Sequence, residues 1–246
     1  MKGDKIYCIG DSHVSVFLGI DRLAPIWPES YKSLIPNFEV IRLGPITAYN
    51  ICEYNRTSHG REKLEKVLEG IPDNSWVIIS AGEIDCRVHL IKQAELQNKS
   101  FEEVAANVAS RFVNFISDIT KNRFKVCLLL PPPTSFRVDD DPDNPKYGSE
   151  VERNKITGTL IKKLISECSI LGIPTINIFE QASTPELETK RIYLWDGIHL
   201  STYALPDLIY QLKNITKLKL NVPPLWRVRE SLRKLKRLST LKISIL

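Results

Sequence analysis

The chain has 246 residues, of which 43% are hydrophobic and 26% charged, and its formal net charge is +5. This length suits one large α/β domain with an appendage, and the composition is that of a globular protein, which argues against disorder. No stretch approaches the roughly 20 apolar residues that cross a bilayer. The first ten residues contain no apolar signal-peptide core, so we expect a cytoplasmic protein.

Strand-like hydrophobic runs alternate with longer helical patterns along the chain. The runs expected to form strands are 5–10, 38–43, 76–81, 125–130 and 174–179. Helical periodicity covers 60–70, 100–120 and 150–172, and Ser100 and Glu103 have the spacing of a capping box at the start of the second of these helices. Such alternation is typical of a parallel sheet with helices on both faces. We therefore expect an α/β fold with five parallel strands.

The positive charge is concentrated at the C-terminus. Residues 221–246 contain seven basic residues and one acid, so the rest of the chain is near neutral. Apolar residues recur there at three- and four-residue steps, which predicts a basic amphipathic helix over 223–246 after a globular domain over 1–222. Two roles are open: contact with an anionic membrane surface at the inner face of the membrane, or packing on the body or on a second copy. Nucleic acid is disfavoured because the body has no basic and aromatic groove.

The cysteines and the acidic residues show no cofactor motif. The five cysteines are scattered without a Cys-x-x-Cys pair, which predicts reduced and mostly buried thiols. No cluster has metal-ligand spacing, and no phosphate-binding glycine loop is present, so we expect neither metal nor cofactor.

A segment rich in Pro, Asp and Asn, 131–149, follows the fourth expected strand. Its composition predicts an irregular loop at the carboxyl edge of the sheet. Two interpretations are open: a lid or substrate wall, or a solvated excursion.

Short polar motifs follow several of the expected strands. The first hydrophobic run ends in Gly-Asp-Ser-His at 10–13, Gly44 follows the second run, and "AGEIDCR" at 81–87 follows the third. Asp196 and His199 stand three residues apart near the end of the body. Because the carboxyl ends of parallel strands meet at one edge, these motifs are expected to gather there.

The residue types suit nucleophilic catalysis. A serine hydroxyl becomes nucleophilic when a histidine within hydrogen-bond reach takes its proton, and a carboxylate orients that histidine. The developing oxyanion needs preorganised donors, often backbone N–H groups in a glycine-containing turn. Ser12, His199, Asp196 and the Gly44 amide supply one candidate for each role.

Together the four motifs resemble the SGNH (GDSL-like) hydrolase family over roughly residues 4–220. The resemblance implies a flavodoxin-like, three-layer α/β/α sandwich. It also implies Ser12 as nucleophile, His199 as general base and Asp196 as its orienting carboxylate, with the N–H groups of Ser12 and Gly44 as oxyanion donors. The "GDSH" and "GEIDCR" motifs are similar to those of a divergent bacterial subgroup associated with surface polysaccharides.

The resemblance implies a serine esterase that removes O-acyl groups, above all acetyl, from a carbohydrate through an acyl-enzyme. The same triad serves an O-acyltransferase acting on a surface polysaccharide or its precursor, so this alternative stays open. A catalytically weak, SGNH-like binding protein is the third hypothesis.

One position departs from the family pattern. The third motif of the family carries Asn before its Asp, as a further oxyanion donor, whereas this chain has Ile84. Losing one such donor costs about 3 kcal/mol of transition-state stabilisation, or roughly a hundredfold in rate. Asn50, Arg87 and His89 are candidate substitutes.

The residues expected to contact substrate are His13, Asn50, Asp85, Arg87 and His89. Alternatives exist for several of them: His13 and His89 also suit helix starts, and Glu83 or Asp85 can serve to hold Arg87 in place.

Overall fold

The computed structural model describes residues 5–139 and 141–220 of the chain. Its sheet has five parallel strands in the order β2-β1-β3-β4-β5, which confirms the expected α/β fold. The strands are β1 (Ile6–Gly10), β2 (Phe38–Arg42), β3 (Trp76–Ser80), β4 (Lys125–Leu129) and β5 (Thr175–Ile176). The predicted helix over 223–246 lies outside the described residues and stays a prediction.

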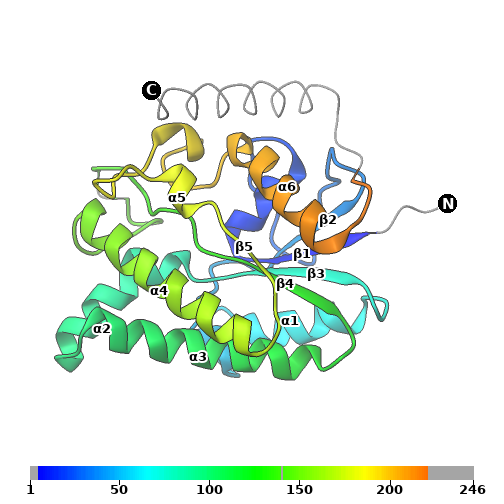
Figure 1. Cartoon of the computed structure of the whole chain (residues 1–246), viewed down its shortest axis with the longest axis horizontal. Helices are drawn as coiled ribbons and strands as arrows, with labels where there is room; N and C mark the ends of the chain where they lie inside the picture. The colour runs from blue at the N-terminus through cyan, green and yellow to red at the C-terminus, as the bar shows by residue number, and fades with distance from the viewer. Residues whose placement is uncertain (1–4, 140, 221–246) are drawn as a thin grey trace, which may run out of the picture.

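Helices cover both faces of the sheet (Figure 1). They are α1 (Gly60–Glu69), α2 (Leu90–Gln97), α3 (Phe101–Thr120), α4 (Glu150–Ile170), α5 (Phe179–Ala182) and α6 (Leu205–Thr216). The expected capping box is present at α3, where the Ser100 hydroxyl accepts from the Glu103 N–H and the Glu103 carboxylate accepts from the Ser100 N–H. Helices α1–α4 lie on one side of the sheet, and α5 and α6 on the other.

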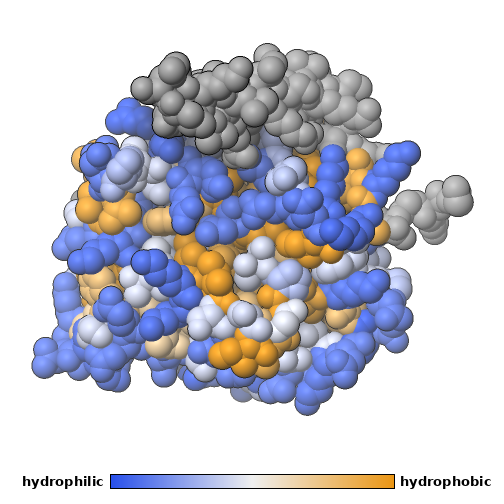
Figure 2. Space-filling view, in the orientation of Figure 1, coloured by the Kyte–Doolittle hydropathy of each residue, from blue (hydrophilic) through white to orange (hydrophobic). Residues whose placement is uncertain are grey.

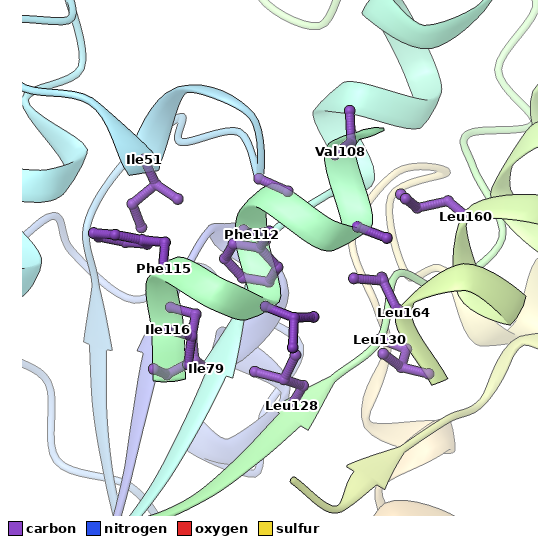
Figure 3. Close-up of a cluster of buried hydrophobic side chains, with 14 of the residues drawn as sticks. Ile51, Ile79, Val108, Phe112, Phe115, Ile116, Leu128, Leu130, Leu160 and Leu164 are labelled. Carbon is purple, nitrogen blue, oxygen red and sulfur yellow. The ribbon is translucent and has the colours of Figure 1, made fainter. Parts of the chain in front are cut away.

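Two hydrophobic cores separate the three layers. Figure 3 shows the larger one, in which Phe112 of α3 packs over the sheet beside Ile79 of β3 and Leu128 of β4. The second core joins the opposite face to α6 and to a 3-10 helix, Ser12–Leu18, through side chains such as Phe17 and Leu208. Burial of apolar side chains on both faces of the sheet holds it between the two helical layers.

The register of the strands sets the place of the polar motifs. Gly10 of β1 pairs with Arg42 of β2 and with Ser80 of β3, so the three strands end at the same level. Ser12 and Gly44 each follow these paired residues by two positions. The motifs therefore leave the sheet side by side at its carboxyl edge, as expected.

The strand expected over 174–179 is shorter in the structure. It ends at Ile176, beyond which side chains bind the backbone N–H groups that would continue the strand. The Asn177 N–H donates to the side chain of Gln211, and the Asn177 side chain accepts from the Phe179 N–H, which starts α5. The helices α2, α5 and α6 were not among the helical segments expected from the sequence.

The surface facing the viewer in Figure 2 is mainly hydrophilic, with separate hydrophobic areas, one at the C-terminal end of α4 where Ile170 and Leu171 are exposed. Among residues 5–139 and 141–220, no helix is long and apolar enough to cross a membrane. All five cysteines are free thiols in the structure, and four of them are buried, as expected, while Cys52 is partly exposed.

Candidate active site

Ser12 stands at the first turn after β1, where a side-chain cap holds the chain. The Asp11 carboxylate accepts from the His13 N–H at 3.0 Å and from the Ser80 hydroxyl at 3.2 Å. The Asp11 N–H in turn donates to the Ser80 carbonyl at 3.0 Å. Asp11 is therefore the N-cap of the Ser12–Leu18 helix and also joins β1 to β3. Ser12, partly exposed, is fixed at the edge of the sheet.

Asp196 and His199 form a hydrogen-bonded pair. The Nδ1 atom of His199 lies 2.6 Å from Oδ2 of Asp196. The other oxygen, Oδ1, accepts from the His199 N–H at 2.7 Å and from the Ile198 N–H at 3.0 Å. Burial opposes the charge of Asp196, but these bonds outweigh it and lower its pKa from 3.8 to about 2. The ionised carboxylate orients the ring so that Nε2 is left to accept a proton.

The two motifs meet through their neighbours. The Leu200 N–H donates to Nδ1 of His13 at 3.3 Å, and the His13 and His199 ring centroids are 6.0 Å apart. His13 follows Ser12 directly, and Leu200 follows His199. The chain segments that carry Ser12 and His199 are thus in direct contact.

Gly44 lies beside these segments in a backbone conformation that suits a donor turn. Its φ is +110°, in the region that glycine adopts without strain. The preceding Leu43 N–H donates to the Gly10 carbonyl at 2.8 Å, which ties this turn to the end of β1. Among the described residues, the N–H groups of Ser12 and Gly44 donate no hydrogen bond, so both are free for a ligand.

Next to Ser12 in the sequence, His13 belongs to a buried cluster of ionisable side chains that also contains Glu83 and Arg87. Arg87 Nε donates to the Glu83 carboxylate at 2.8 Å, and Glu83 Oε2 lies 3.9 Å from Nε2 of His13. Burial opposes the charge of Glu83, but His13 and Arg87 outweigh it and hold the pKa of Glu83 below its usual value. Likewise burial opposes a charged His13, yet Glu83 and Asp11 raise the pKa of His13. Glu83 thus holds Arg87, as one of the sequence alternatives proposed.

Two buried arginines anchor the 131–149 loop. Arg87 donates to the Pro145 carbonyl. Arg153 of α4 donates to the Ser135 carbonyl at 2.8 Å and also to the Gly148 carbonyl, so it binds both ends of the loop. Sequence reasoning missed Arg153, because its partners, which include the Thr134 hydroxyl, lie up to nineteen positions away.

The first part of the loop is packed against the site. Residues 131–135 are buried. A Cβ atom at Gly197, within the Asp196–His199 turn, would lie 2.7 Å from Cγ of Arg137. This contact favours the interpretation of that part as a wall of the site, whereas Asp139, Pro142 and Asp143 near the tip of the loop are exposed.

The residues expected to contact substrate separate into two groups. His13 and Arg87 belong to the buried cluster of ionisable side chains that contains Glu83. Asn50, Asp85 and His89 line a separate cavity beside the Gly44 turn. Both Asp85 oxygens accept backbone N–H groups, from Ala48 at 2.6 Å and from Tyr49 at 3.2 Å. Burial raises the Asp85 pKa to about 6 against these two bonds.

Ile84 carries no side-chain donor, and the structure provides no substitute among the candidates. The Arg87 guanidinium is engaged by Glu83 and Pro145, and Asn50 and His89 face the cavity. One residue that sequence reasoning missed is Trp195, whose ring stacks on His199 with centroids 6.0 Å apart. The sequence offered one signal for Trp195, its position directly before Asp196. Within the described part of the chain, no group of three or more His, Cys, Asp or Glu residues is placed to hold a metal ion.

Comparison with known proteins gives structural matches. No family model and no curated protein match the chain. A carbohydrate acetylesterase from Sinorhizobium meliloti matches with 18% identity and a TM-score of 0.51, over 87% of this chain and 98% of that one. The aryl esterase of M. smegmatis matches with 19% identity and a TM-score of 0.51, over 88% and 100%. A GDSL-like lipase from Bacteroides thetaiotaomicron matches with 16% identity and a TM-score of 0.51, over 87% and 89%.

These likenesses concern the fold. The chain has the α/β/α fold of SGNH (GDSL-like) hydrolases, with the strand order 2-1-3-4-5, over most of its length. The resemblance stated from the four sequence motifs is confirmed at this level.

The low pKa of Asp196 predicts a pH-dependent contribution to stability. A carboxylate with a folded-state pKa below its ordinary value stabilises the fold above that value, and the contribution disappears as the pH falls from 3.8 toward about 2. The variant Asp196→Asn lacks this titration. Urea unfolding of both proteins between these pH values should show their difference in unfolding free energy shrinking with falling pH. A constant difference would contradict the assignment.

The buried Glu83–Arg87 pair predicts an asymmetric response to mutation. Glu83→Leu leaves Arg87 as an uncompensated buried cation and should cost about 3–5 kcal/mol of unfolding free energy. The double variant Glu83→Leu/Arg87→Leu removes both charges and should cost less. Lys66→Ala is the control, because it breaks an exposed pair with Glu69 and should cost no more than about 1 kcal/mol. Denaturant unfolding measures all three, and equal losses in Glu83→Leu and Lys66→Ala would refute a structural role for the pair.

Proposed function

We propose that the protein is a serine-dependent esterase that removes O-acyl groups, above all acetyl, from a carbohydrate through an acyl-enzyme. The observation that carries this proposal is the Asp196–His199 pair, bonded at 2.6 Å and in contact, through Leu200 and His13, with the segment that bears Ser12. The SGNH-like fold supports it, because esterases and an acylhydrolase share that fold.

The proposed reaction has two halves. In the first, Nε2 of His199 takes the Ser12 hydroxyl proton while Oγ attacks the acyl carbonyl carbon, and the same proton then passes to the leaving sugar oxygen. In the second, His199 takes a proton from water, the water oxygen attacks the acyl carbon, and Ser12 Oγ leaves with that proton. Asp196 stabilises the imidazolium that forms in each half.

The N–H groups of Ser12 and Gly44 would stabilise the oxyanion. Both are free of hydrogen bonds to the described residues, and donors held by the fold cost no reorganisation during the reaction. With Ile84 in place of the third donor, the turnover should be slower by roughly a hundredfold than with a complete oxyanion hole.

The identity of the substrate, an acylated carbohydrate, is the more specific part of the proposal. It draws support from the sequence motifs and from the carbohydrate acetylesterase among the matching structures, which is 18% identical. An acyltransferase would use the same triad with a sugar hydroxyl in place of water. A binding protein with weak or no catalysis is favoured by one observation, the missing donor at Ile84.

Covalent labelling tests the activated serine. Intact mass measured after exposure to a fluorophosphonate should show one adduct per chain. The adduct should be absent in Ser12→Ala and in His199→Ala, since the first lacks the nucleophile and the second lacks its base. Arg22→Ala, an exposed change, is the control and should label like the parent. Labelling that survives in Ser12→Ala would refute Ser12 as the nucleophile, and no labelling of the folded parent would shift the assignment to the binding protein.

Acceptor competition separates the two enzymatic alternatives. The parent protein is given para-nitrophenyl acetate together with increasing concentrations of a neutral oligosaccharide. For an esterase, free acetate should appear in step with nitrophenol at every concentration. If acetate release falls while acetylated oligosaccharide accumulates, the protein is an acyltransferase.

A further inference from the structure

A cavity of about 430 Å³ lies outside the proposed triad. It is bounded by Thr47, Tyr49 and Asn50, by His89 and by the adjoining parts of α2 and α3. Small-molecule sites in proteins typically enclose about 300–1,000 Å³ with a few convergent polar groups on an apolar floor. Here Leu90, Val104 and Val108 supply the buried apolar part.

The polar wall is rich in uncharged side chains. It contains Tyr49, Asn50, His89, Gln93, Gln97 and Asn107. Within the described part of the chain, the side chains of Asn50, His89 and Asn107 make no hydrogen bond, so their polar atoms are available. An amide offers a donor and an acceptor together, which matches a sugar hydroxyl that also donates and accepts.

The charged groups of the cavity are already engaged by the protein. The Glu103 carboxylate accepts from the N–H and the hydroxyl of Ser100, both at 2.8 Å. The Lys99 ammonium donates to the Gln97 side chain at 3.0 Å.

Asp85, also in the wall, is bonded to the Ala48 and Tyr49 N–H groups. Burial, Lys92 and Arg87 lower the pKa of His89, which favours its neutral ring. Glu103, Lys99 and Asp85 therefore each have a hydrogen-bond partner within the protein, and the side chains without one, Asn50, His89 and Asn107, are uncharged.

We propose that this cavity binds a neutral sugar unit of the glycan that carries the ester. In naming the glycan, the proposal rests on the proposed function. The polypeptide itself connects the cavity to the proposed site: the segment 47–50, which contributes to the wall, begins three residues after Gly44, and Asp85 binds this segment to the helical turn that follows β3. A sugar bound here would lie against the chain segment that continues from Gly44, and on this proposal the cavity positions the glycan while Ser12 reacts with its acyl group.

Binding measured by NMR tests this site without turnover. The probes are xylotetraose, cellotetraose and mannotetraose, each with and without O-acetylation, added to isotope-labelled Ser12→Ala. The side-chain amide signals of Asn50 and Asn107 should shift, while that of Asn114 should not. Asn114 is the matched control because it is an exposed amide two turns further along α3, outside the cavity.

Mutation then tests the contacts. Asn50→Ala/Asn107→Ala in the same background should weaken binding at least about fivefold, because each neutral hydrogen bond contributes about 0.5–1.5 kcal/mol. Asn114→Ala should leave the dissociation constant unchanged. Thermal unfolding should be similar for both, since all three side chains reach solvent.

Several results would overturn the proposal. They are no binding of any of the six probes, binding that the double variant does not weaken, or tighter binding of oligogalacturonate than of the neutral probes. The outcome is independent of the triad, because Ser12→Ala cannot turn over. If the fluorophosphonate fails to label the parent but the sugar binds here, the esterase is wrong and the cavity stands. If labelling succeeds and no sugar binds, the cavity is wrong and the esterase stands.

Discussion

The close approach of β1 to β3 at Gly10 is the constraint on which the rest of the site depends. A Cβ atom at this position would lie 2.1 Å from the Ser80 carbonyl oxygen, so only glycine lets the two strands end side by side. The Asp11 N–H then reaches that same oxygen, and the Asp11 carboxylate receives the Ser80 hydroxyl. Backbone geometry and these two polar contacts thus position Ser12 independently of Asp196 and His199.

The polar groups around Ser12 are distributed differently from the pattern that the sequence motifs imply. The position of the usual amide donor, Ile84, is apolar, whereas Glu83 directly before it forms a buried ion pair with Arg87, and this pair reaches toward His13 and toward the loop. A buried pair of this kind contributes little net stability relative to apolar packing. Its effect here is to join three chain segments, from β1, β3 and the 131–149 loop, at one place.

Local sequence patterns made part of this structure predictable. The features that depend on contacts between distant segments could not be predicted from the sequence. The strands, the capping box at Ser100 and the Asp196–His199 spacing are short patterns with a direct physical meaning, and the structure has them near the expected residues. The truncation of β5 depends on Gln211, thirty-four positions away from Asn177. The cavity depends likewise on how α3 packs beside residues 47–50, which no single segment encodes. Asn107 therefore looks like an ordinary solvent-facing residue of a helix when the sequence is considered alone.

The two arginines that anchor the 131–149 loop have a consequence for how this scaffold can diversify. Arg153 binds the chain at Ser135 and at Gly148, and Arg87 binds it at Pro145, so the ends of the loop are held from the body of the domain. The exposed tip between them contributes little to the hydrophobic cores. Insertions and deletions at the tip can accumulate while the anchored ends keep their places. Sequence changes at the tip can therefore alter the selectivity of the site while the fold of the domain stays the same.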